Sequence, residues 1–186
     1  MPSPQNCIDH QPGQCVDLID IAEHVLDECY RALLPILGPQ TDGNILRAYT
    51  TVGPGGDDGV VDALCVSFLG AGPTPGSTAG NITTAYPGIK ARFQVSLVES
   101  GWPMVKIEGS RVTLPGTTEI AAASRHAYAH GEALYRHIIS LNNGRRIAPM
   151  FPGSVASIGP LTPRPPQAGI VGWIVNFEVL MGWGGG

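Results

Sequence analysis

The sequence predicts an α/β (α+β) fold, in which a mostly antiparallel or mixed sheet is flanked by two main helices, with long loops between the elements. Strand-like alternation is clearest near the C-terminus, where apolar side chains occupy the odd positions from Val171 to Trp183. A second alternating run covers residues 89–97. Apolar residues at helical intervals of three and four mark residues 16–34 and 117–141.

The first predicted helix, residues 16–34, carries apolar residues on one face and acidic residues mostly on the other. Acidic side chains near its start are favourable beside the positive end of the helix dipole. Pro35, Gly38 and Pro39 are expected to end this helix, because proline and glycine are poor helix formers. A short strand is expected at residues 45–51.

The second predicted helix begins after the break at Pro115-Gly116, with Thr117 as its N-cap candidate, and ends at Asn142-Asn143-Gly144. Its packed stripe has small residues in the N-terminal half and large ones later. This arrangement predicts that the N-terminal half approaches a sheet or another helix closely.

The strands between the helices are predicted from shorter patterns. Residues 63–69 alternate large and small side chains, as in a central strand covered on both faces. A further extended piece is expected at residues 105–114. The glycine-rich segment 52–59 is interpreted as a solvated turn, since it lacks the Lys-Ser/Thr pair of a phosphate loop and the spaced oxygen ligands of a calcium loop.

The domain organisation is expected to be a single domain over residues 1–186. Residues 1–14 are expected to form a flexible N-terminal arm, since they are rich in proline and polar groups. Residues 70–88 form a long, nearly uncharged loop, which we expect a neighbouring molecule to order. Residues 159–169 are predicted to be a stiff, proline-rich arm leading into the terminal strand, in which Trp173 and Phe177 are expected to be core residues.

The composition favours a protein that is covered in part by other subunits, because 43% of residues are hydrophobic and only 14% are charged. A net charge of −4 gives no basic footprint for sequence-specific nucleic-acid binding. We expect no membrane segment and no secretory signal, hence a start in the cytoplasm, where the four cysteines would be free thiols.

Three histidines, His126, His130 and His137, are the main candidates for chemistry, because their spacing places imidazoles on one side of the second helix. A zincin motif would place Glu after the first histidine, but Ala127 stands there, and the sequence offers no obvious third ligand. We therefore expect no bound metal, no cofactor and no catalytic residue, and interpret the protein as a non-enzyme.

Three stretches resemble the tail terminator proteins of long-tailed (siphovirus-like) phages that infect actinobacteria. They are the C-terminal IGPLTPRPPQAGIVGW (158–173), the Ala-rich helix EIAAASRHAYAHGEALYRHI (119–138) and ARFQVSLVESGWP (91–103). The chain departs from the pattern at Pro165 and Ala168, where glycines are expected, and at Ser100-Gly101, which replace an Arg-Cys-type ending.

The resemblance implies a hexameric ring that caps the tail tube, ends its polymerisation and joins the tail to the head-side connector. Its partners would be further copies of the chain, the tail tube protein and a stopper or connector protein, with genomic DNA passing through the lumen. The protein would be part of the virion neck, assembled in the host cytoplasm.

The loop and the arm supply the expected subunit contacts. The candidate interface residues are Pro73, Pro75, Tyr86, Pro160, Pro163, Arg164 and Gln167. The alternatives are another neck protein, such as a head-tail stopper or connector ring, a small His-dependent metalloenzyme, and an unrelated soluble monomer.

Overall fold

The computed structural model describes residues 8–11, 14–16, 18–37, 46–53, 62–73, 89–149 and 154–181. Within these ranges the elements follow one another as β1 (Ile8–Gln11), β2 (Gln14–Val16), α1 (Leu18–Leu37), β3 (Arg47–Val52), β4 (Ala63–Pro73), β5 (Ile89–Ser100), β6 (Lys106–Glu108), β7 (Arg111–Thr113), α2 (Thr117–Asn143), β8 (Val155–Gln167) and β9 (Ile170–Met181). Neither helix has the length and apolar character needed to cross a bilayer.

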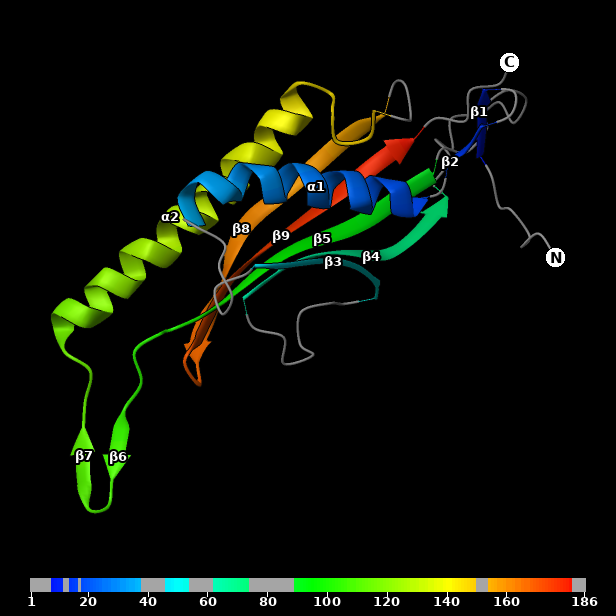
Figure 1. Cartoon of the computed structure of the whole chain (residues 1–186). Helices are drawn as coiled ribbons and strands as arrows, with labels where there is room; N and C mark the ends of the chain where they lie inside the picture. The colour runs from blue at the N-terminus through cyan, green and yellow to red at the C-terminus, as the bar shows by residue number, and fades with distance from the viewer. Residues whose placement is uncertain are drawn as a thin grey trace, which may run out of the picture.

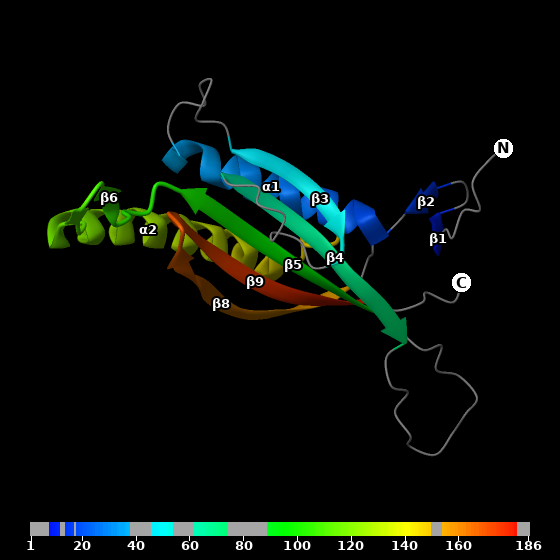
Figure 2. The same ribbon diagram turned by 90° about the horizontal axis from the view of Figure 1, so that it is seen from below.

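A five-stranded sheet forms the centre of the molecule, with the strand order β3-β4-β5-β9-β8. β3 runs parallel to β4, and every other neighbouring pair in this sheet is antiparallel. Both helices lie on the same side of the sheet (Figure 1), and the opposite side is seen from below in Figure 2. The prediction of an α+β fold with a mixed sheet and two main helices is therefore confirmed.

The core lies between the helices and the sheet. The rings of Phe93 on β5 and Phe177 on β9 are register partners and stack with their centroids 5.0 Å apart. Trp173 and Phe177 are buried, as predicted from the alternation of the terminal strand. The opposite face of these strands is polar at one end, with an ion pair of 2.6 Å between Lys90 and Glu178, and carries the apolar Val98 and Ile174 toward the other end. The period of two in each strand thus assigns the faces correctly.

α1 differs from the prediction at both ends, and α2 differs at its start. α1 begins at Leu18, and Val16, which was expected in this helix, belongs to β2. α1 continues through Pro35 and ends at Leu37. Proline is tolerated there because it lies in the last turn, where few further hydrogen bonds depend on it. α2 begins at Thr117, so its N-cap is Gly116, whose extended φ of −70° and ψ of 150° suit that position. Thr117 is therefore the first helical residue and not the cap.

The structure corrects the prediction of a proline-rich arm at residues 159–169. Residues 159–167 belong to β8, an edge strand hydrogen-bonded to β9. The pairing shifts register between Ile158 and Leu161, and again between Arg164 and Gln167. These intervals contain Pro160 and the pair Pro165-Pro166, which lack the N–H that a regular ladder needs. An edge strand tolerates such interruptions, whereas a central strand would lose pairing on two sides.

Three other predicted segments are only partly described. Residues 8–11 and 14–16, which overlap the expected N-terminal arm, form a short antiparallel pair of strands. Residues 70–73 of the expected long loop are the end of β4, and residues 74–88 lie outside the described residues. Most of the turn expected at 52–59 also lies outside them. The extended piece expected at 105–114 is the hairpin formed by β6 and β7.

Candidate functional site

The β6–β7 hairpin and the N-terminal half of α2, which follows it in the chain, extend beyond the sheet at the same end of the molecule (Figure 1). Residues 117–126 of this helix are exposed except for the half-buried Ala123, and its first buried residue is Ala127. The predicted close approach of the N-terminal half therefore does not extend to its first turns. Close packing begins only where the stripe reaches Ala127 and Gly131, because the sheet ends beneath the first turns.

The hairpin is a two-stranded ribbon that turns at Gly109, whose φ of 60° favours glycine. Its central register pair, Ile107 and Val112, is 71% and 60% exposed. Further exposed apolar side chains lie beside the ribbon and on α2. Together we call this group the projecting surface: Met104, Val105, Ile107, Val112, Leu114, Ile120 and Tyr128. Exposed apolar side chains on segments that extend from the body of a molecule are typical of surfaces that another molecule covers.

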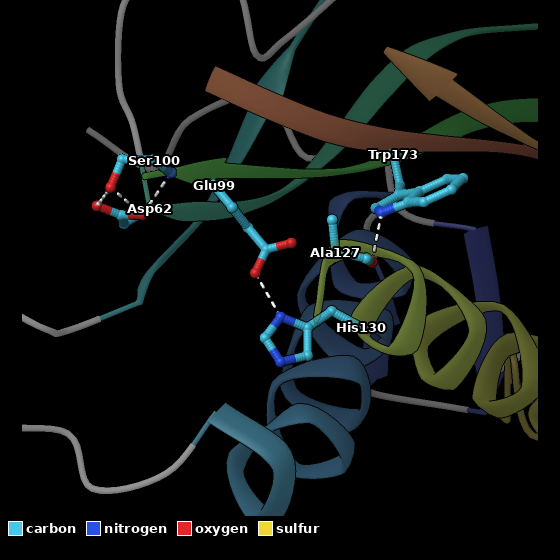
Figure 3. A network of polar contacts seen from close by, with 6 residues as sticks. All are labelled: Asp62, Glu99, Ser100, Ala127, His130 and Trp173. Carbon is cyan, nitrogen blue, oxygen red and sulfur yellow. Dashed lines mark hydrogen bonds and ion pairs between the residues drawn. The ribbon is translucent and has the colours of Figure 1, made fainter. Parts of the chain in front are cut away.

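Two hydrogen bonds hold the base of the projection, that is, the places where the hairpin segment and α2 leave the sheet. The backbone N–H of Trp102, which follows β5, donates to the carbonyl of Gly169 in the β8–β9 turn over 2.9 Å. The indole Nε1–H of Trp173 donates to the carbonyl of Ala127 over 2.8 Å (Figure 3). The first contact holds the start of the hairpin segment, and the second holds α2 where it leaves the sheet.

Gly131 allows α2 to lie directly against the Trp173 ring. A Cβ atom at position 131 would be 2.5 Å from two ring carbons of Trp173, closer than a real side chain allows. The glycine therefore sets how near the helix comes to β9. This is the close approach that the small residues of the stripe predict, located one turn later than expected.

A buried carboxylate meets a buried histidine at this base. The Oε1 atom of Glu99, near the end of β5, makes a hydrogen bond with Nδ1 of His130 on α2 (Figure 3). His130 is only 3% exposed. The hydrogen bond to Glu99 is the main cause that raises the pKa of His130, and it outweighs burial, which acts in the opposite direction. The negative charge of Glu99 and the backbone of Ile36 raise this pKa further.

His126 adds a second imidazole to this pair. Its ring centroid is 4.1 Å from that of His130, in an edge-to-face arrangement. One ligand atom from each of Glu99, His126 and His130 lies within 4.8 Å of the others. We call these three residues the Glu-His-His cluster. A pocket of about 360 Å³ lies against it, with Glu99, His126 and Trp102 in its walls.

The structure does not bring His137 into this cluster, so the three candidate histidines do not form one group. Seven residues correspond to about 10.5 Å along a helix axis, too far for His130 and His137 to share an ion. His137 instead faces α1, where its Nε2 lies 3.7 Å from Oε2 of Glu28. Burial is the main cause that lowers the pKa of His137. The negative charge of Glu28 opposes this shift, and the positive charge of Arg146 adds to it.

Glu99 is the residue that the sequence analysis missed, since no third ligand was identified there. A signal was present in the β5 pattern. Ala91, Phe93, Val95 and Leu97 form the buried face of this strand, and Glu99 continues the same odd-numbered positions. A carboxylate at a position whose side chain points to the buried face of a strand requires a partner in the interior.

The residues predicted to form subunit contacts do not lie together. Pro160, Pro163 and Gln167 are exposed and Arg164 is half-buried, all on β8. Gln167 pairs with Ile170, which pairs with Ser100 at the end of β5, whereas Pro73 pairs with Ile89 at the start of β5. Pro73 and Gln167 are therefore at opposite ends of the sheet. Pro75 and Tyr86 lie outside the described residues.

The described part of the chain thus has two features that can carry function: the projecting surface, suited to a macromolecular contact, and the Glu-His-His cluster at its base, suited to holding a cation. No protein-family model matches the sequence, and no curated protein matches it either.

Proposed function

We propose that the chain is a structural subunit of a phage neck that assembles into a ring, caps the end of the tail tube and stops its polymerisation. The proposal joins the resemblance of residues 91–103, 119–138 and 158–173 to tail terminators with the surface properties of the folded chain. The ring would contact the tail tube protein on one side and a stopper or connector protein on the other.

The observation that carries the proposal is the projecting surface. Ile107 and Val112 lie on a ribbon that extends away from the sheet, and Ile120 and Tyr128 expose apolar groups on the adjoining helix. Each buried methylene group contributes about 0.8 kcal/mol when it leaves water, so covering several such side chains supplies a substantial part of a subunit contact. A projection of this kind can reach a neighbouring subunit without bringing the two sheets together.

The net charge and the composition of the chain are compatible with the same role. A net charge of −4 gives the chain no general attraction for phosphate, so DNA would pass a ring of such subunits without being held. The low share of charged residues, 14%, is consistent with a molecule that is partly covered in its assembled state.

The test compares oligomerisation and tube capping for the native chain and two aspartate variants. The double change Ile107→Asp and Val112→Asp places charges on the projecting surface, where both side chains are exposed and the fold does not depend on them. The matched control is Val52→Asp on β3, because Val52 is 78% exposed but lies on an edge strand of the five-stranded sheet and not on the hairpin. Light scattering over a concentration series gives the mass, and electron microscopy gives the length of tubes grown from the tail tube protein of the same phage.

We expect the native chain and the Val52→Asp variant to form closed rings, alone or on tube ends, and to limit tube length. The hairpin variant should stay monomeric and leave tube length unrestricted. A native chain that remains a monomer and neither binds nor limits tubes would refute the proposal. A ring that binds a stopper or connector but not the tube would assign the chain to a neighbouring position in the neck.

A further inference from the structure

We propose that Glu99, His126 and His130 bind a zinc ion, which links the end of β5 to α2 where the projection begins. The inference does not depend on the proposed role in the phage neck. It starts from the composition of the cluster: two imidazoles one helical turn apart and one carboxylate from another element, with a ligand atom of each within 4.8 Å of the others. Two histidines and one acidic residue, with a fourth position left for water, form a common zinc ligand set.

The surroundings of His130 hold its ring in the orientation that a metal ligand needs. Nδ1 faces Glu99, and the ring is only 3% exposed, so the residues packed around it restrict its rotation. With Nδ1 directed at the cluster, Nε2 is left to carry the ring proton. Metal-bound histidines characteristically donate their second ring N–H to a carbonyl or carboxylate, which fixes the tautomer and the ring plane.

Glu99 has a buried oxygen that its contact with His130 does not use. Its Oε1 atom meets His130, while Oε2 is buried and has no hydrogen-bond partner among the described residues. An unsatisfied carboxylate oxygen in the interior is unfavourable and requires an explanation. A cation beside the carboxylate supplies the missing interaction, because a zinc ion attracts both oxygens of the group.

A metal-free ion pair between Glu99 and protonated His130 accounts for less of the geometry. It would explain the short contact of Oε1 with Nδ1, but it gives no partner to Oε2. It also gives no reason for the exposed His126 to hold its ring 4.1 Å from that of His130. Two neighbouring imidazoles repel when both are charged, whereas a shared cation holds both in the neutral form.

The position of His126 and the pocket complete the site. Zinc bonds of about 2.0–2.2 Å require ligand atoms about 3.5 Å apart in a tetrahedron. The direct contact between Oε1 of Glu99 and Nδ1 of His130 must therefore open to admit the ion, and a rotation of the exposed His126 side chain would close the set. The pocket of about 360 Å³ lies against Glu99 and His126 and provides room for a water molecule as the fourth ligand. It also provides the path by which the ion enters.

The experiment measures zinc binding by the full chain after treatment with a chelator. Isothermal titration with zinc chloride gives affinity and stoichiometry, elemental analysis gives the zinc content after dialysis, and a thermal melt with and without zinc reports the link to folding. The variant His126→Ala removes an exposed ligand, so the fold should be retained. His137→Ala on the same helix is the matched control, because His137 contacts Glu28 and not the cluster.

We expect one zinc ion per native chain and a higher melting temperature when zinc is present. His126→Ala should weaken zinc binding by at least ~100-fold, the upper end of the loss seen when only a supporting residue of a zinc site is removed. It should also abolish the shift in melting temperature, while His137→Ala keeps both properties. In the cobalt-substituted chain, the visible absorption of a tetrahedral ion should disappear in His126→Ala.

Two results would overturn the inference. One is a native chain that takes up no zinc at neutral pH. The other is zinc binding that persists unchanged in both His126→Ala and Glu99→Gln, which would locate the ion on other residues. Because mass and tube capping are measured separately, a failed zinc experiment leaves the proposed function untouched, and a failed capping experiment leaves the zinc site untouched.

Discussion

Replacing Gly131 with alanine tests how α2 is held against the sheet. The new Cβ would lie 2.5 Å from Cδ2 and Cε2 of Trp173 and 2.7 Å from Nε1. A normal contact between carbon atoms needs about 3.5–4.0 Å, so the ring or the helix must move by roughly 1 Å or more. Either movement also strains the 2.8 Å hydrogen bond from Trp173 to the carbonyl of Ala127.

The expected cost follows from three effects. Overpacking a filled interior destabilises a protein by about 1–3 kcal/mol. Weakening a buried hydrogen bond adds about 1 kcal/mol. Alanine is a better helix former than glycine by about 1 kcal/mol, which offsets part of this loss. We therefore expect Gly131→Ala to lower the free energy of unfolding by about 1–3 kcal/mol.

Urea unfolding followed by circular dichroism measures this change, with Gly72→Ala as the control. Gly72 lies in β4, and nothing is within 4 Å of a Cβ at that position, so the control should be close to neutral. Combining Gly131→Ala with Trp173→Leu should cost less than the sum of the two single changes, because the smaller side chain removes the clash. A Gly131→Ala variant as stable as the native chain would refute the packing argument.

Three further predictions concern other contacts. Asp62, with a φ of 54°, accepts hydrogen bonds from the backbone N–H and the hydroxyl of Ser100 (Figure 3), so Asp62→Ala should lower the free energy of unfolding in urea by about 1–2 kcal/mol. Asp62→Asn should cost less, because asparagine tolerates this φ and keeps one acceptor oxygen. Equal losses in the two variants would contradict this account. The stability that the Glu99–His130 contact contributes in the metal-free chain should be fully present below the ordinary histidine pKa of 6.5 and should decline as pH rises through the raised pKa of His130. The stability difference between the native chain and Glu99→Gln should therefore shrink as pH rises from neutral, and a difference that grows with pH would disprove the assignment. Burial, reinforced by the negative charge of Glu28, raises the pKa of the Cys29 thiol to about 12. Iodoacetamide at pH 8 should therefore label this thiol only after the chain unfolds, which peptide mass spectrometry would show. Rapid labelling of the folded chain would contradict the burial of Cys29.

The strands and helices of the core were predictable because their side-chain periods are local properties of the sequence. The alternation of β5 and β9 identified Phe93, Trp173 and Phe177 as inward-facing, and the structure confirms all three as buried. The spacing of three and four likewise identified both helices. Each signal depends on neighbouring residues and on burial on one face, which is information that a single stretch of sequence contains.

The cluster and the projection were harder to predict because they depend on which segments meet. Glu99 and His130 are separated by 31 residues and meet only because β5 and α2 lie together at one end of the sheet. The exposure of residues 117–126 depends on where the sheet ends, which no helical period reveals. The hairpin itself had a local signal, since Gly109-Ser110 separates two short runs that contain Ile107 and Val112.

The order of strands gives the sheet two unlike borders, with a consequence for how copies of the chain can associate. β8 has prolines at positions 160, 163, 165 and 166. Successive residues of a strand direct their N–H groups to opposite sides, so these prolines remove donors from the free border as well as from the ladder with β9. β3 contains no proline from Arg47 to Val52. A closed ring needs a contact between two different surfaces of each subunit, whereas pairing one border with itself gives only a twofold dimer. In the proposed ring, the β8 border would therefore contribute few backbone hydrogen bonds to a sheet continued between subunits, and side chains would form most of each joint.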